Sequence, residues 1–283
     1  MNLLSKLRLG MKEKEIDAVL VLDELNQRYL SNFAFTDGYL LITHTNAYLV
    51  TDFRYYEMAE KRANRDFEIV MPDNRMGFLD EKVAEFSIRR IGFEGGTVSF
   101  AAYNRYRERL ATVEMVDIGS MIEQLRQIKT AEELSLMQKA QDITDLAFAH
   151  VLSVITPEMT EIDVAVELEY AMRKNGADGF AFDTIAVSGD ASALPHGTPR
   201  NEKLRRGFLT MDFGAKFDGY CSDMTRTIVI GKADDEMKKL YNTVLKAQTE
   251  ALAYYGSYAL RRSVRWFFIS SCSRRNDGLL GYR

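Results

Sequence analysis

The sequence is poor in cysteine, proline, histidine and tryptophan. Its 283 residues include two Cys, four Pro, three His and one Trp. Two cysteines cannot build the framework of a small disulfide-rich secreted protein, and they are consistent with a reducing compartment. The sequence also lacks low-complexity segments, so we expect folded domains over most of its length.

Long apolar runs and a strong net charge are absent as well. The formal net charge is −4 and 46% of the residues are hydrophobic, which excludes a general electrostatic attraction for nucleic acid. No run approaches the length of a membrane span, and the first residues, MNLLSK, lack the apolar core of a signal peptide. We therefore expect a cytoplasmic protein with neither nucleic-acid nor membrane partners.

The periodicities that are present indicate an α/β fold. A helical pattern at 3–14 precedes a buried strand at 17–22, and a hairpin follows at 39–51. A chain of this length can hold two domains. We place the first domain at residues 1–122 and the second at residues 123–256.

The second domain is expected to begin with two capped helices. Thr130 and Glu133 form a capping-box pattern ahead of a long helix that runs to about residue 154. Thr160 precedes a second helix, and Gly176 ends it. A β-rich segment, residues 180–230, follows.

Two aspartates in that segment, Asp212 and Asp223, flank the loop sequence KFDG at 216–219. Asp-Gly is a strong hairpin signal, and folding about the middle of this loop sets Asp212 directly opposite Asp223. Facing carboxylates repel each other, and carboxylates within apolar strands are costly unless paired or metal-bound. Because carboxylate oxygens suit ions such as Mn²⁺, the pair predicts half of a metal site. The alternative is a pair of solvated surface acids.

Two further residues are candidates for the same site. His196 lies between Pro195 and Gly197, with Pro199 close behind, which indicates a stiff loop. Histidine exchanges protons near neutral pH, so His196 is a candidate catalytic residue, and a surface histidine is the alternative. Strand alternation directs Cys221 to the face of Asp223, where it either lines the site or is a small buried strand residue.

The order and spacing of several segments resemble the pita-bread metallopeptidases, which include Xaa-Pro aminopeptidases and prolidases. The resemblance covers about residues 1–255. Its first part is similar to the N-terminal domain of creatinases and prolidases. The matching segments are IDAVLV (16–21), NQRYLSNF (26–33), YLVTDFRYY (48–56), FDTIAVSG (182–189), ALPHGTP (193–199), MDFG (211–214) and YCSDMTRT (220–227).

The resemblance implies roles for individual residues. Asp212 would chelate one divalent ion and Asp223 would bridge two, with Mn²⁺ expected and Co²⁺ or Zn²⁺ as alternatives. His196 would hydrogen-bond the substrate or the tetrahedral intermediate, while Phe182 and Ile185 would line the pocket next to the scissile bond. Such ions activate water for attack on a peptide carbonyl.

The expected substrates are peptides with proline at the second position, and the intact family member is expected to be a homodimer. Aminopeptidase and dipeptidase activities stay open. A creatinase-like amidinohydrolase is a second enzyme hypothesis, and a non-catalytic protein that binds a partner is a hypothesis of a different class.

The sequence departs from the family pattern after Asp223. The family draws one His and two Glu ligands from downstream motifs, but no His follows Asp223, and Glu236 and Glu250 fall within a helical pattern. We therefore expect at most one weakly bound ion and no peptidase activity from these 283 residues. Residues 257–283 contain six Arg, no Lys and five Ser. This change predicts a frameshifted or disordered tail, with a genuine basic tail as the alternative.

Overall fold

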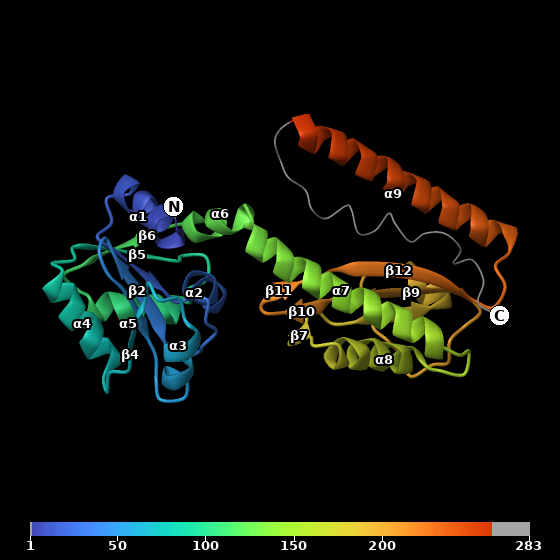
Figure 1. Ribbon diagram of the computed structural model, residues 1–283, viewed down its shortest axis with the longest axis horizontal. Helices are drawn as coiled ribbons and strands as arrows, with labels where there is room; N and C mark the ends of the chain where they lie inside the picture. Colours follow the sequence, from blue (N-terminus) through green and yellow to red (C-terminus); the bar gives the residue numbers. More distant parts are fainter. Residues whose placement is uncertain (1, 262–283) are drawn as a thin grey trace. The chain divides into compact units, whose positions relative to one another are not determined.

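The computed structural model describes residues 2–261, with side chains for residues 2–254, and divides them into two compact units (Figure 1). Unit 1 ends at Ile128 and unit 2 begins at Lys129. The boundary expected after residue 122 falls within helix α6 (Met121–Gln127). This helix stays with unit 1 because Ile122 is buried in the same core as Leu4 and Leu7 of α1 (Leu3–Glu13).

Unit 1 contains a six-stranded sheet in the order β4-β3-β2-β1-β5-β6. Strand β2 pairs antiparallel with both of its neighbours, whereas the other pairs are parallel. The expected first strand and hairpin are confirmed by β1, β2 and β3. The strands are β1 (Ala18–Val21), β2 (Tyr39–Thr43), β3 (Ala47–Val50), β4 (Glu68–Val70), β5 (Arg90–Phe93) and β6 (Glu114–Asp117).

Both faces of this sheet are covered, so its central strands are apolar on both sides. Alternate residues of β1 enter two cores, with Val19 and Val21 in one and Ala18 and Leu20 in the other. The first core includes residues of α1 and α6, and the second includes residues of α4 and α5. The remaining helices of unit 1 are α2 (Glu24–Ser31), α3 (Tyr56–Arg62), α4 (Arg75–Glu85) and α5 (Phe100–Arg109).

Unit 2 opens with the two expected helices, α7 (Ala131–Val154) and α8 (Glu161–Lys174). Both begin with capping boxes, which confirms Thr130 and Thr160 as N-caps. Buried side chains of both helices pack against strand β9 (Gly207–Phe213) in one core. Figure 1 shows the two helices on one face of the strands. This packing leaves the opposite face of the sheet outside that core.

The other elements of unit 2 form two small sheets and a terminal helix. One sheet has the order β11-β10-β7 and the other the order β12-β9-β8. Helix α9 continues to Arg261, beyond the change in composition at residue 257. The rest of the expected tail lies outside the described residues. The elements are β7 (Gly179–Phe180), β8 (Ile185–Ser188), the 3₁₀ helix η1 (Gly189–Ala193), β10 (Ala215–Phe217), β11 (Tyr220–Cys221), β12 (Met224–Ile230) and α9 (Asp235–Arg261).

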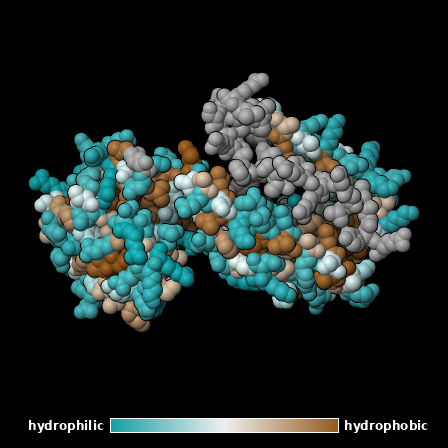
Figure 2. All heavy atoms as spheres, in the orientation of Figure 1, coloured by the Kyte–Doolittle hydropathy of each residue, from teal (hydrophilic) through white to brown (hydrophobic). Residues whose placement is uncertain are grey.

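The visible surface is mainly hydrophilic, with small hydrophobic patches (Figure 2). None of the helices between residues 2 and 261 combines the length and apolar character needed to cross a bilayer.

Candidate metal and substrate site

The hairpin predicted from Asp-Gly is present, and its turn consists of Asp218 and Gly219. Phe217 pairs with Tyr220, which leaves two residues in the loop. Their φ angles are 43° and 79°, as a type I′ turn requires. This turn matches the right-handed twist of the flanking strands, so the local sequence accounts for the hairpin.

The predicted pairing of the two aspartates is wrong by two residues. Asp212 pairs with Thr225, and the same register carried through the hairpin sets Asp223 opposite Gly214. The prediction treats residues 216–219 as a four-residue loop, whereas the type I′ turn uses only the last two of these residues. Because the shift is an even number, both aspartates keep a common side of the ribbon, as diagonal neighbours.

Asp212 lies on the face of the β12-β9-β8 sheet that points away from the helices. Burial alternates along β9, with Leu209, Met211 and Phe213 in the helix-covered core. Asp212 therefore points to the other face, which we call the open face. Ile185 is directly across from it on β8. The structure thus places a predicted metal ligand beside a predicted substrate-contacting residue.

The charge of Asp212 acts on Asp223. Asp212 Oδ1 is buried and makes no hydrogen bond, which costs free energy unless a cation or donor satisfies it. Burial, followed by the negative charge of Asp212, raises the pKa of Asp223 above its usual range. The arrangement is that of two acidic side chains which a positive ion would stabilise.

Buried hydroxyl groups hold this part of the hairpin to helix α7. The Ser222 and Thr144 hydroxyl oxygens are 2.6 Å apart. They accept hydrogen bonds from the Ala215 N–H, at 2.9 and 3.1 Å respectively. Gly214 is required here because a Cβ at this position would lie 2.0 Å from the Ser222 carbonyl oxygen. These hydrogen bonds and the close contact at Gly214 together fix the backbone between the two aspartates.

The loop that carries His196 crosses the open face. A Cβ on Gly197 would lie 2.9 Å from Val187 Cγ1, so the backbone of the loop rests on this residue. Val187 pairs with Thr210, next to the Ile185–Asp212 pair. The His196 side chain itself is exposed. The structure brings the loop to this face, while the role of the imidazole stays a prediction.

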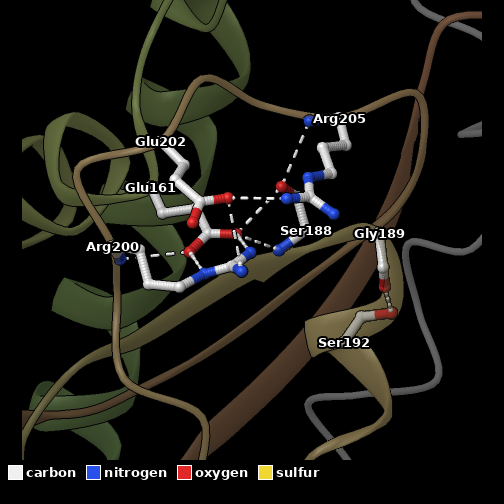
Figure 3. Close-up of polar contacts among 7 residues, drawn as sticks. All are labelled: Glu161, Ser188, Gly189, Ser192, Arg200, Glu202 and Arg205. Atoms are coloured by element: carbon white, nitrogen blue, oxygen red, sulfur yellow. Dashed lines mark hydrogen bonds and ion pairs between the residues drawn. The ribbon is translucent and has the colours of Figure 1, made fainter.

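A buried carboxylate anchors the same loop (Figure 3). Glu161, at the start of α8, accepts hydrogen bonds from the Ser188 N–H and hydroxyl at 2.7 and 2.9 Å. It also accepts from Arg200 N, Nε and Nη2 at 3.0, 2.8 and 2.7 Å. Burial alone would raise the pKa of Glu161, but these hydrogen bonds outweigh it and lower the pKa to about 2. Glu161 therefore joins α8, β8 and the middle of the loop, at Arg200.

Sequence reasoning missed this anchor. The sequence indicates Glu161 only as the first residue of a helix, and Arg200 lies far from it along the chain. An acid at the first turn of a helix is common for electrostatic reasons alone. The one available signal is a glutamate followed by an apolar helical pattern, which does not reveal its partner.

The two remaining candidates differ in their surroundings. Phe182 is half-buried in the connection between β7 and β8, three residues before Ile185, and its contact with substrate stays a prediction. Cys221 is exposed and has a free thiol. The alternative in which it is a small buried residue is wrong, because the neighbouring Ser222 takes the buried position.

The residues present fit part of a metal centre. The orphaned Asp212 oxygen and the nearby Asp223 carboxylate match the oxygen ligands of a hard divalent cation. Among the described residues, however, no three His, Cys, Asp or Glu side chains come together in a group that could hold a metal ion. The hairpin thus offers two carboxylates that suit such an ion, and their role as metal ligands stays a prediction.

Comparison with known proteins supports the same relationship. Residues 4–128 match the Creatinase/Prolidase N-terminal domain, and residues 135–257 match Metallopeptidase family M24. The chain is 35% identical over 253 residues to the Xaa-Pro dipeptidase of Pyrococcus furiosus. That alignment covers 88% of this chain and 70% of the relative.

Solved structures agree with the fold. An Xaa-Pro dipeptidase from Bacillus anthracis is similar with a TM-score of 0.82 and 41% identity, over 87% of this chain and 69% of that one. An X-Pro aminopeptidase from Thermotoga maritima gives a TM-score of 0.80 and 34% identity, over 89% and 72%. These matches confirm the expected α/β fold class. The chain belongs to Metallopeptidase family M24, with a creatinase/prolidase N-terminal domain, a family that uses divalent metal ions.

Proposed function

We propose that this chain carries the aspartate hairpin and part of the substrate-binding face of an Xaa-Pro peptidase, which hydrolyses the bond before proline. The observation that carries the proposal is the buried Asp212 oxygen without a hydrogen bond, next to Asp223 and directly across from Ile185. The relatives named Xaa-Pro dipeptidase and X-Pro aminopeptidase support the substrate class.

In this proposal Asp212 and Asp223 hold divalent metal, with Mn²⁺ preferred. A bound ion of this kind polarises the peptide carbonyl and favours ionisation of the attacking water. Ile185 and Phe182 contact the side chain or proline ring beside the scissile bond. His196 donates a hydrogen bond to the substrate, from a loop held by Glu161 and the backbone of Gly197.

The described residues provide too few ligands for two ions, so we expect the 283-residue protein to bind at most one ion weakly and to show no peptidase activity. Titration calorimetry with Mn²⁺ tests the first point. Asp212→Asn and Asp223→Asn should each abolish binding. Asp145→Asn is the matched control, because Asp145 is an exposed residue of α7 that accepts a hydrogen bond from Gln141. Equal Mn²⁺ binding by all three variants would refute the assignment of the ligands.

A chimaera tests the activity. Residues after 256 would be replaced by the corresponding C-terminal part of the Bacillus anthracis Xaa-Pro dipeptidase, a structure of which this chain covers 69%. The chimaera with Mn²⁺ should hydrolyse an Xaa-Pro dipeptide faster than the matched Xaa-Ala dipeptide, and Asp223→Asn should abolish this activity. A folded chimaera without Xaa-Pro hydrolysis would instead favour a partner-binding role.

A further inference from the structure

Unit 1 contains a cavity of about 520 Å³ at the carboxyl edge of its sheet. Its lining comes from the segments that follow β1, β4 and β5 and from the start of β2. Strands β1 to β4 follow one another toward one edge of the sheet and β5 and β6 toward the other, so the strand order reverses between β1 and β5. Ligands of open α/β sheets bind outside the carboxyl ends of strands where the strand order reverses. The volume falls within the range of small-molecule sites, about 300–1,000 Å³.

Charges of both signs line this cavity. Arg75 begins helix α4 and Arg105 belongs to α5, whereas Asp23 follows β1 and Asp37 precedes β2. A purely anionic ligand would meet the two aspartates, and a purely cationic one would meet the two arginines. The cavity therefore suits a ligand that carries one charge of each sign. The apolar part of its lining is formed by Leu22, Met76, Val98 and Ala102.

Two arginine side chains form the basic side of the cavity. Arg75 Nη1 is buried without a hydrogen bond, 3.8 Å from an Asp52 carboxylate oxygen that is itself 2.7 Å from Arg54, and 39% of the Arg75 side chain is exposed. The guanidinium of Arg105 lies over the ring of Tyr106, with Cζ 5.6 Å from the ring centroid. Two guanidinium groups with planar donor arrays suit a carboxylate.

Both arginines and Tyr106 belong to the lining of the cavity. Burial raises the pKa of the Tyr106 hydroxyl, and the positive charges of Arg105 and Arg75 both oppose this rise. The hydroxyl group of Tyr106 is therefore exposed to the positive charge of both arginines. A carboxylate bound on this side of the cavity would be attracted by both charges.

The acidic side has one carboxylate with spare capacity. Asp37 forms an ion pair with Arg54 at 2.7 Å, so its charge is neutralised within the protein. Asp23 Oδ1 accepts a hydrogen bond from the Asn26 N–H at 2.9 Å as the N-cap of α2. A carboxylate accepts about four hydrogen bonds, so Asp23 can also bind an ammonium group.

We propose that this cavity binds a zwitterion of the amino-acid class, either a free amino acid or a dipeptide, with an aliphatic side chain. Its carboxylate contacts Arg75 and Arg105, its ammonium group contacts Asp23, and its side chain packs on Leu22 and Met76. The site uses unit 1 alone and none of the residues of the aspartate hairpin.

Titration calorimetry on the full-length protein tests this assignment with probes that differ by one charged group. The probes are L-leucine, leucyl-glycine, 4-methylpentanoate, which lacks the ammonium group, and 3-methylbutylamine, which lacks the carboxylate. L-leucine, leucyl-glycine or both should bind, and the analogues with one charge should bind at least about tenfold more weakly. The relative affinities of the first two probes distinguish a free amino acid from a dipeptide as the preferred ligand.

Variants connect the binding to the cavity. Arg105→Gln should weaken binding at least about tenfold, as should Asp23→Asn, which removes the charge but keeps a good N-cap. Arg107→Gln, an exposed position of the same helix, and Asp212→Asn in unit 2 should bind as the parent does, with thermal melts verifying that each variant folds. Equal affinity for leucine and 4-methylpentanoate would overturn the zwitterion assignment. Absence of binding by every probe, or unchanged binding by Arg105→Gln, would overturn the site.

Discussion

Replacement of Glu161 by glutamine tests the buried anchor of the His196 loop. The carboxylate has no exposed surface and accepts five hydrogen bonds, three of them from Arg200. Glutamine removes the charge and turns one acceptor into an NH₂ group that faces other donors. Breaking one partner of a buried pair costs about 3–5 kcal/mol. Because 35% of the Arg200 side chain is exposed, water can compensate part of this loss, and we expect about 3 kcal/mol.

The assay is thermal unfolding followed by circular dichroism and calorimetry. For a unit of about 150 residues, 1 kcal/mol shifts Tm by about 2–4 °C, so the unit 2 transition should fall by about 6–12 °C. Glu202→Gln is the matched control, since Glu202 pairs with Arg200 and Arg205 at 3.4 and 2.8 Å but is 45% exposed. An exposed pair contributes less than about 1 kcal/mol. Equal effects of the two substitutions would refute the reasoning.

The same comparison has a defined pH dependence. The folded-state pKa of Glu161 lies at about 2, below the ordinary value of 4.5. A lowered pKa stabilises the folded state above the ordinary value, and this contribution is lost as the pH falls toward the folded-state value. The stability difference between the parent and Glu161→Gln should therefore be complete at about pH 6 and shrink from about pH 4.5 toward pH 2. A difference that stays constant across this window would contradict the assigned role.

Two other substitutions test the packing around the site. Gly214→Ala should destabilise unit 2 by about 1–3 kcal/mol or more, because the new Cβ would meet the Ser222 carbonyl at 2.0 Å. Gly96→Ala, which meets no atom within 4 Å, should change stability by less than about 0.5 kcal/mol in the same melts. Leu168→Ala in α8 should cost about 2–5 kcal/mol in urea unfolding, since Leu168 is fully buried. Val166→Ala, at a position 55% exposed in that helix, should cost far less, and similar losses would show that the helix packs differently.

Sequence reasoning succeeded where the signal was local. The N-caps at Thr130 and Thr160 and the Asp218-Gly219 turn are set by residues within a few positions of one another, and all three are present. The alternation of helical and strand patterns indicated the α/β class, in agreement with the family resemblance. The pairing of Asp212 was wrong because a four-residue loop and a two-residue turn share the same letters and differ only in backbone geometry.

Contacts between distant segments could not be predicted in this way. Arg75 and Arg105 line one cavity only because β4 and β5 end at the same edge of one sheet. The Glu161–Arg200 pair depends likewise on how α8 packs against β8 and the following loop. The spacing of residues along the sequence does not encode such contacts, because they depend on the topology of the sheet and on how its connecting segments pack.

The two-residue turn of the aspartate hairpin imposes a parity rule on the chain between Asp212 and Asp223. Successive side chains of a strand point to opposite faces, so adding or deleting one residue in this interval would send the two carboxylates to opposite sides of the ribbon. A change of two residues would preserve their common side and alter only their diagonal offset. Length variation between these aspartates in related sequences should therefore occur in steps of two, or as single residues accommodated by a β-bulge.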